Sequence, residues 1–157
     1  MINEAYLKQA KSRAAKYCAG RERSPYQVLQ KLFAWELDED NAQQVLAELI
    51  AENFIDEERF ARAFCHDKFE FNQWGKIRIR QELSQHRIAE NMIQIGLNSI
   101  DPAKYEEVIF KLAVKKWSLL KDDPWIKKQK TTAFLVRKGF EMDLAIEAVR
   151  KVSAGIH

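Results

Sequence analysis

Residues 32–49 read LFAWELDEDNAQQVLAEL, and this stretch decides the fold because it recurs twice along the chain. Residues 83–100, LSQHRIAENMIQIGLNSI, align with it after a shift of 51, and residues 135–152, LVRKGFEMDLAIEAVRKV, align after a further shift of 52. The positions that are apolar in all three copies are Leu32, Leu83 and Leu135; Leu37, Ile88 and Phe140; Ala42, Ile93 and Ala145; Leu46, Leu97 and Val149; and Leu49, Ile100 and Val152. A period of this length predicts tandem structural repeats.

Each copy has the pattern of two helices joined by an apolar corner, which is Leu37, Ile88 or Phe140. The last three matched positions are spaced by four and then three residues, as on one face of an α-helix. A longer helix precedes each pair, so each unit is predicted to hold three helices, the last two proportioned like a helix-turn-helix. The expected helices span residues 2–19, 24–35, 38–52, 56–72, 75–86, 88–99, 102–121, 123–138 and 140–153.

The predicted fold class is therefore all-α, with three tandem three-helix repeats stacked into an elongated, curved array. The predicted repeats are residues 1–54, 55–101 and 102–157. An array of this kind usually offers a continuous surface to an extended partner, and it seldom encloses a catalytic pocket.

Capping chemistry marks the predicted helix starts. Ser24 stands before Pro25 and three residues before Gln27, which is the pattern of an N-cap with a capping box. Asp-Pro pairs repeat the start signal at residues 101–102 and 123–124. Further acidic starts follow Leu37 and Ile55, at Asp38 and Asp56. Gly75 breaks the chain before Lys76, and Gly139 is the expected C-terminal cap of the helix before it.

Composition excludes several classes of protein. Of the 157 residues, 46% are hydrophobic and 31% charged, with five Gly and three Pro, which is a folded and helix-favouring composition. No apolar run approaches the roughly 20 residues that span a bilayer, and no secretory signal opens the chain, so we expect a cytoplasmic protein without a membrane segment. Cys18 and Cys65 suit a reducing compartment, and we expect both to be small buried groups.

The net charge of +3 is placed unevenly. The first two predicted repeats carry −1 each, whereas residues 102–157 carry +5. A basic segment of this kind favours polyanions or acidic protein surfaces as partners.

Four stretches, in this order, resemble the RecX family of regulators of the RecA recombinase. They are RSPYQVLQKL at 23–32, FIDEERFARAF at 54–64, GKIRIRQEL at 75–83 and FLVRKGF at 134–140. The Asp followed by Arg-Phe-Ala in the second stretch is the most specific of these elements, and the resemblance extends from about residue 10 to residue 150.

One departure from the family pattern concerns the corner turns. Family members often place Gly where the second helix of each repeat ends, but only Gly139 does so here, because Glu36 and Arg87 occupy the matching positions. A left-handed cap costs a non-Gly residue about 1 kcal/mol. We therefore expect those two turns to differ in shape from the third.

The resemblance implies a protein that binds RecA filaments on single-stranded DNA and inhibits filament extension. ATP hydrolysis, strand exchange and co-protease activity of RecA would fall with it. The implied partner is the RecA filament, with single-stranded DNA as a second candidate. The resemblance implies no cofactor, and we expect a monomer that is not an enzyme.

Basic residues near the predicted repeat corners are the candidate contacts, since a nucleoprotein filament exposes phosphates and acidic groups. They are Arg21, Arg23, Lys76, Arg78, Arg80, Lys127, Lys128, Lys130, Arg137 and Lys138. A structural role is the alternative for each: Arg78 can pair with Glu82 on a solvated helix face, and Arg137 and Lys138 can complement a helix C-terminus.

Among the four Trp, Trp74 is the candidate for stacking on a base, because its polar neighbours Asn72 and Gln73 predict an exposed loop. For Trp117 we favour packing between helices.

We find no catalytic or metal-binding motif in this sequence. His66 adjoins Cys65, but neighbouring helical residues point about 100° apart and do not grip one metal ion together. The chain holds no HExxH, paired CxxC or phosphate-cradling Gly-rich loop. Two other hypotheses remain: a sequence-specific helix-turn-helix DNA-binding protein, which the acidic or neutral third helices disfavour, and a helical scaffold with no nucleic-acid role.

Overall fold

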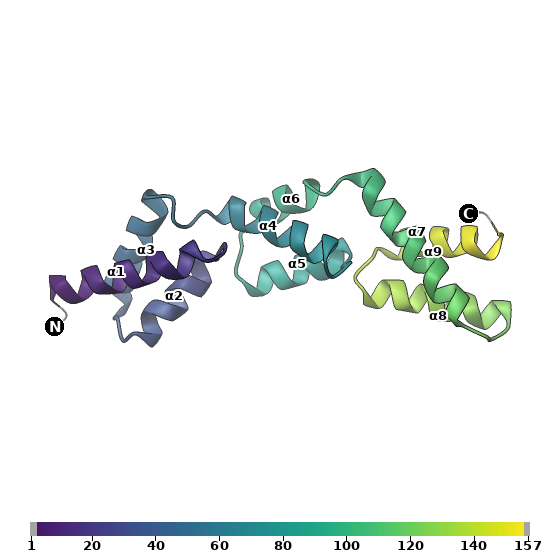
Figure 1. Cartoon of the computed structure of the whole chain (residues 1–157), viewed down its shortest axis with the longest axis horizontal. Helices are drawn as coiled ribbons and strands as arrows, with labels where there is room; N and C mark the ends of the chain where they lie inside the picture. Colours follow the sequence, from purple (N-terminus) through teal and green to yellow (C-terminus); the bar gives the residue numbers. More distant parts are fainter. Residues whose placement is uncertain (1–2, 156–157) are drawn as a thin grey trace. The chain divides into compact units, whose positions relative to one another are not determined.

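Figure 1 shows the computed structural model, which describes residues 3–155. Within this range the chain forms nine α-helices and no strand. They are α1 (Glu4–Ala19), α2 (Pro25–Ala34), α3 (Glu39–Ala51), α4 (Glu57–Glu70), α5 (Lys76–Gln85), α6 (Glu90–Asn98), α7 (Pro102–Leu119), α8 (Pro124–Arg137) and α9 (Met142–Ser153). The predicted all-α fold of three tandem three-helix repeats is confirmed.

The hydrophobic core consists of the faces that the repeat predicted. Every one of the matched apolar positions is buried, from Leu32, Leu83 and Leu135 at the ends of the second helices to the residues along the third helices. Ala42, Ile93 and Ala145 are all buried at the matching position, so the position is apolar in each repeat although its side chain differs in size.

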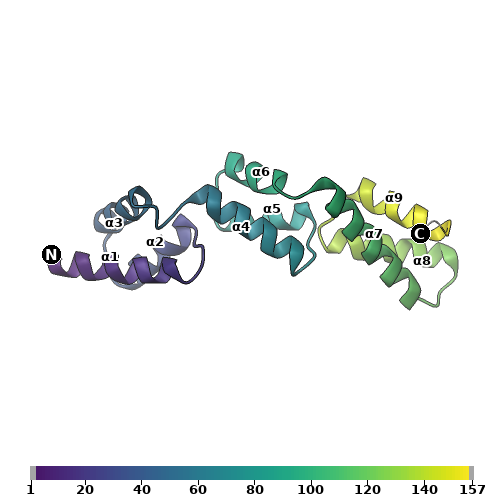
Figure 2. The ribbon, with the colours of Figure 1, turned by 45° about the horizontal axis from the view of Figure 1, so that its top comes forward.

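By its packing the chain divides into two compact units. One comprises the chain up to Ala63 with Leu83–Ile95, and the other comprises Phe64–Glu82 with the chain from Gly96 onward. Helices α1, α2 and α3 pack on one another in the first unit, and α7, α8 and α9 pack on one another in the second, as both ribbon views show (Figures 1 and 2). The middle repeat contributes residues to both units.

The predicted helix caps are present, with one exception. The Ser24 hydroxyl accepts the Gln27 N–H at 3.1 Å, and the Gln27 side chain accepts the Ser24 N–H at 2.9 Å, which completes the capping box. The carboxylates of Asp56, Asp101 and Asp123 each accept a backbone N–H of the helix that follows. Asp38 instead accepts from the Asn41 side chain and caps no backbone N–H.

The three corner turns share one shape, so the expected difference between them was wrong. Glu36 and Arg87 adopt φ of 67° and 57°, in the left-handed region that Gly139 also occupies at 101°. In each turn the corner residue donates its N–H five residues back, as in a Schellman motif: Leu37 to Leu32, Ile88 to Leu83 and Phe140 to Leu135, at 3.1–3.2 Å. Burying such a corner side chain stabilises by about 1.5–3 kcal/mol, which exceeds the strain of about 1 kcal/mol.

Two glycines bring backbone against backbone in the second unit. The Gly75 N–H donates to the Lys138 carbonyl at 2.8 Å, and the Ile77 N–H donates to the Gly139 carbonyl at 3.0 Å. A Cβ atom on Gly75 would lie 2.2 Å from the Gly139 carbonyl carbon, so only glycine permits this approach. The start of α5 is thereby fixed against the end of α8.

Candidate basic-aromatic site

Several basic residues flank the Gly75–Gly139 contact, and two of them lie over the Trp74 indole. We name this set the Trp74 cluster, and its members are Lys68, Trp74, Lys76, Arg78 and Lys138. The Arg78 guanidinium carbon lies 3.9 Å from the centroid of the Trp74 ring, and the Lys68 ammonium lies 4.9 Å from it. Each is close enough for a cation–π interaction.

The other two cations of the cluster, Lys138 and Lys76, contact groups other than Trp74. The Lys138 ammonium donates to the Asn72 carbonyl at 3.0 Å, and the Lys76 ammonium lies 4.9 Å from the Tyr105 ring centroid. Tyr105 is buried, and its hydroxyl accepts the Lys76 N–H at 2.9 Å and donates to the Glu141 carboxylate. The first turn of α5 is therefore fixed by its backbone hydrogen bonds to Lys138 and Gly139 and by the hydrogen bond from the Lys76 N–H to Tyr105.

Electrostatics inside the Trp74 cluster favours an anionic partner. Burial lowers the pKa of the Lys138 ammonium, and the nearby charge of Arg78 lowers it further. An anion placed beside these cations would offset the repulsion between them, and a phosphate or carboxylate is the group that guanidinium recognises best.

The exposure expected of Trp74 is a prediction that the structure contradicts. The Trp74 side chain is half-buried, because Lys68 and Arg78 cover its ring. The exposed tryptophan is Trp125 at the start of α8, which is 68% exposed. The polar neighbours Asn72 and Gln73 did not reveal this burial of Trp74, because the side chains that cover the ring come from α4 and α5. Trp117 is half-buried beneath Lys127, consistent with packing between helices.

The three candidate lysines of α8 have different surroundings. Lys130 forms an ion pair with Asp122 at 3.1 Å, and Lys127 lies 4.5 Å from the Trp117 ring centroid. Lys128 is exposed and lines a shallow groove together with Arg137 and Met142. Of these predicted contacts, Lys128 and Arg137 are thus the pair that the structure places together.

The remaining candidates lie elsewhere. Arg23 belongs to the first unit, where its guanidinium stacks 4.0 Å from the Tyr17 ring centroid and its Nε donates to the Tyr17 carbonyl at 3.2 Å. Arg21 is exposed in the loop between α1 and α2, and Arg80 is half-buried on α5 with interactions of its own.

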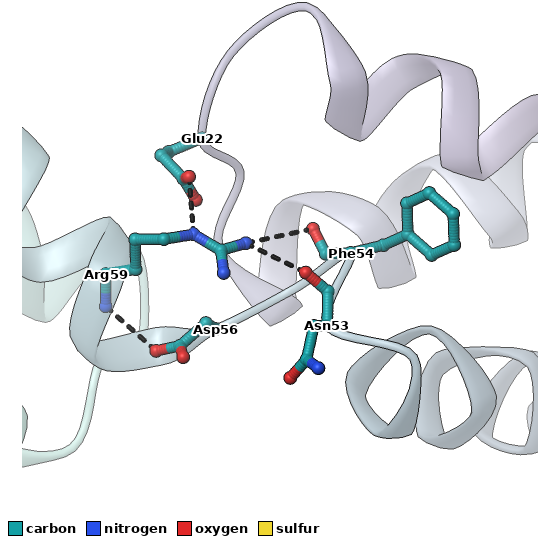
Figure 3. A network of polar contacts seen from close by, with 5 residues as sticks. All are labelled: Glu22, Asn53, Phe54, Asp56 and Arg59. Carbon is teal, nitrogen blue, oxygen red and sulfur yellow. Dashed lines mark hydrogen bonds and ion pairs between the residues drawn. The ribbon is translucent and has the colours of Figure 1, made fainter.

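Arg59, in the stretch 54–64, has a role that the sequence did not reveal (Figure 3). Its Nε lies 2.6 Å from the Glu22 carboxylate, and its terminal nitrogen donates to the Asn53 carbonyl at 3.1 Å and approaches the Phe54 carbonyl at 3.5 Å. The Asp56 carboxylate accepts the Arg59 N–H at 2.9 Å. Arg59 therefore joins the α1–α2 loop to the start of α4, within the first unit.

Both cysteines are buried, as predicted. Burial raises the pKa of the Cys18 thiol, and it raises the pKa of the Cys65 thiol to about 12 although the charge of Lys76 acts in the opposite direction. In the described range, His, Cys, Asp and Glu side chains form no group of three or more that could hold a metal ion. Nor does any helix between residues 3 and 155 combine the length and apolar character needed to cross a membrane.

Fold and surface together define a class: helical repeat proteins that present cations on aromatic rings. Family models described as the first, second and third three-helix domains of RecX match residues 10–49, 56–97 and 104–149. The chain belongs to the RecX family.

Individual relatives agree with this assignment. The "Regulatory protein RecX" of Chlorobium phaeobacteroides is 30% identical over 134 residues, covering 85% of this chain and 87% of the relative. The protein of the same name from Clostridium botulinum is 28% identical over 154 residues, covering 96% and 72%. The crystal structure of RecX from Lactobacillus salivarius has a TM-score of 0.87 at 21% identity, covers 94% of this chain and 97% of its own, and supports the fold.

Proposed function

We propose that this chain regulates RecA by binding RecA filaments on single-stranded DNA and inhibiting their extension. ATP hydrolysis, strand exchange and co-protease activity of RecA fall as a consequence. The protein acts in the cytoplasm as a monomer and has no catalytic activity of its own. The observation that carries the proposal is the match of all three RecX domains, in order, along residues 10–149.

The Trp74 cluster supports a binding role for this part of the chain. Its four cations lie within one compact unit, although Lys68 and Lys138 are far apart in the sequence. A filament on DNA offers phosphates and acidic side chains, and both are ligands for guanidinium and ammonium groups. The two thiols are poor nucleophiles, because burial raises the pKa of each.

The test is the ATPase activity of RecA in the presence of single-stranded DNA, titrated with this protein. We expect loss of hydrolysis at well below one protein per RecA, because blocking a filament end affects many subunits. No effect in excess would refute the proposal and would favour the helical scaffold instead.

A pair of matched variants tests the Trp74 cluster. The double variant Lys76→Gln and Arg78→Gln removes two of its charges and retains the Arg78 Cβ, which lies close to Gly139. Losing charge-assisted hydrogen bonds of about 1.5–3 kcal/mol should raise the inhibitory concentration by roughly 10- to 100-fold. The control, Lys115→Gln and Lys121→Gln, removes two exposed charges in the same unit. Equal inhibition by both variants would remove the cluster from the site.

A further inference from the structure

A second cationic surface lies in the first unit and shares no residue with the Trp74 cluster. It is a groove of about 520 Å³ between α2, the end of α1 and the end of α5, and we name it the Tyr17–Tyr26 groove. Among the residues that line the groove are Tyr17, Tyr26, Gln27, Gln30, Lys31 and Gln85. Its size is that of a small-ligand site, for which 300–1,000 Å³ is typical.

Three cations stack on the two tyrosine rings. The Arg23 guanidinium lies 4.0 Å and the Lys31 ammonium 5.3 Å from the Tyr17 centroid, and the Arg87 guanidinium lies 4.5 Å from the Tyr26 centroid. Arg23 donates its Nε to the Tyr17 carbonyl, so its orientation is set while its terminal amino groups remain for a ligand. No carboxylate is among the residues that line the groove.

The corner turn sets where the Arg87 side chain lies. Arg87 holds φ at 57°, where the third repeat has Gly139, and a side chain in that region costs about 1 kcal/mol. The strained residue is the one whose guanidinium covers Tyr26. Glu36 has the same backbone conformation at the first corner, so what distinguishes Arg87 is that its guanidinium lies on the Tyr26 ring.

We propose that the Tyr17–Tyr26 groove binds single-stranded DNA directly. An unstacked base lies on a tyrosine or guanidinium plane, the adjoining phosphates contact Arg23, Lys31 and Arg87, and the side-chain amides of Gln27, Gln30 and Gln85 meet the polar edges of the base. A duplex does not fit this chemistry, because its base faces are covered by their neighbours. An acidic peptide would use the cations but would leave the flat rings without a matching partner.

The inference deepens the proposed function, on which it rests for the choice of ligand. Its test therefore contains no RecA. A fluorescein-labelled oligo-dT of 20 nucleotides is titrated with the full-length protein at several salt concentrations, and binding is followed by anisotropy. An oligonucleotide of the same length with abasic sites carries the same phosphates without bases, and polyglutamate is the acidic-peptide probe.

The variants separate charge from stacking. Lys31→Gln with Arg87→Gln should lower the slope of log K against log salt by about 1.4, the loss of two phosphate contacts. Lys8→Gln with Lys115→Gln, two exposed lysines outside the groove, should change that slope by much less. Tyr26→Leu should weaken binding of oligo-dT about 5- to 150-fold and leave the abasic oligonucleotide unaffected. Circular dichroism of each variant verifies that it is folded.

Three outcomes overturn the inference: equal binding by the groove and control variants, equal binding of oligo-dT and the abasic strand by the wild type, or tighter binding of polyglutamate than of oligo-dT. Any of these, together with wild-type inhibition of RecA ATPase, would reject the groove as a DNA site and leave the proposed function standing.

Discussion

The contact between Gly75 and Gly139 leads to the sharpest prediction about this fold, which concerns Gly75→Ala. An added Cβ would lie 2.2 Å from the Gly139 carbonyl carbon and 2.3 Å from both its oxygen and the Phe140 nitrogen. All three are backbone atoms, so no side-chain rotation relieves the overlap. The start of α5 must therefore move away from the α8–α9 corner.

The expected cost follows from the interactions that this movement breaks. The hydrogen bonds from Gly75 to the Lys138 carbonyl and from Ile77 to the Gly139 carbonyl contribute about 0.5–1.5 kcal/mol each. Forcing an extra carbon into a packed region costs roughly a further 1–3 kcal/mol. We expect the free energy of unfolding to fall by about 2–6 kcal/mol, with a decrease in Tm of about 2–4 °C for each kcal/mol.

The assay is urea denaturation followed by circular dichroism, combined with hydrogen exchange of the amides of residues 71–80. Gly20→Ala is the matched control, because Gly20 has ordinary helical φ of −72° and its added Cβ would meet nothing within 4 Å. The control should gain about 0.4–1 kcal/mol by restricting the unfolded chain. If Gly75→Ala kept wild-type stability and wild-type protection of the Ile77 amide, the close backbone approach would not exist in solution.

Two further predictions concern the first unit. Glu36→Gly should leave the free energy of unfolding unchanged or raise it by up to about 0.6 kcal/mol in the same urea assay, because relief of about 1 kcal/mol of strain at this exposed corner offsets the about 0.4–1 kcal/mol lost by loosening the unfolded chain; a fall in stability of about 0.4 kcal/mol or more would show that the corner is not strained. Arg59→Lys retains the positive charge beside Glu22 but loses the hydrogen bonds to backbone carbonyls, so it should cost about 0.5–1.5 kcal/mol and speed hydrogen exchange around residues 53–59; unchanged exchange there would mean that the ion pair alone holds this junction.

Several features were predictable from the sequence because their physics is local. Ser24 and Gln27 form a capping box that needs only residues three apart. The Asp-Pro starts at 101–102 and 123–124 act through the first turn of their own helices. The repeated apolar positions also predicted the residues of the hydrophobic core, because an apolar helix face is stable only when it packs against another element.

Other sequence-based expectations failed where they depended on packing. Glu36 and Arg87 were expected to alter their turns, but burial of the corner residues Leu37 and Ile88 holds both in the left-handed conformation. Trp74 was expected to be exposed, and α4 and α5 supply the side chains that cover it. In each case a contact outside the local segment outweighed a local preference.

The sequence by itself determined the helices, their caps and the buried face of each repeat, because these follow from periodicity and from hydrogen bonds within a few residues. Only the tertiary structure decided that Gly75 lies against Gly139, that Arg59 reaches Glu22, and that Lys138 donates to the Asn72 carbonyl. The physical reason is that backbone and side-chain contacts between distant segments depend on how helices pack, and no local preference specifies which distant residue fills a given space.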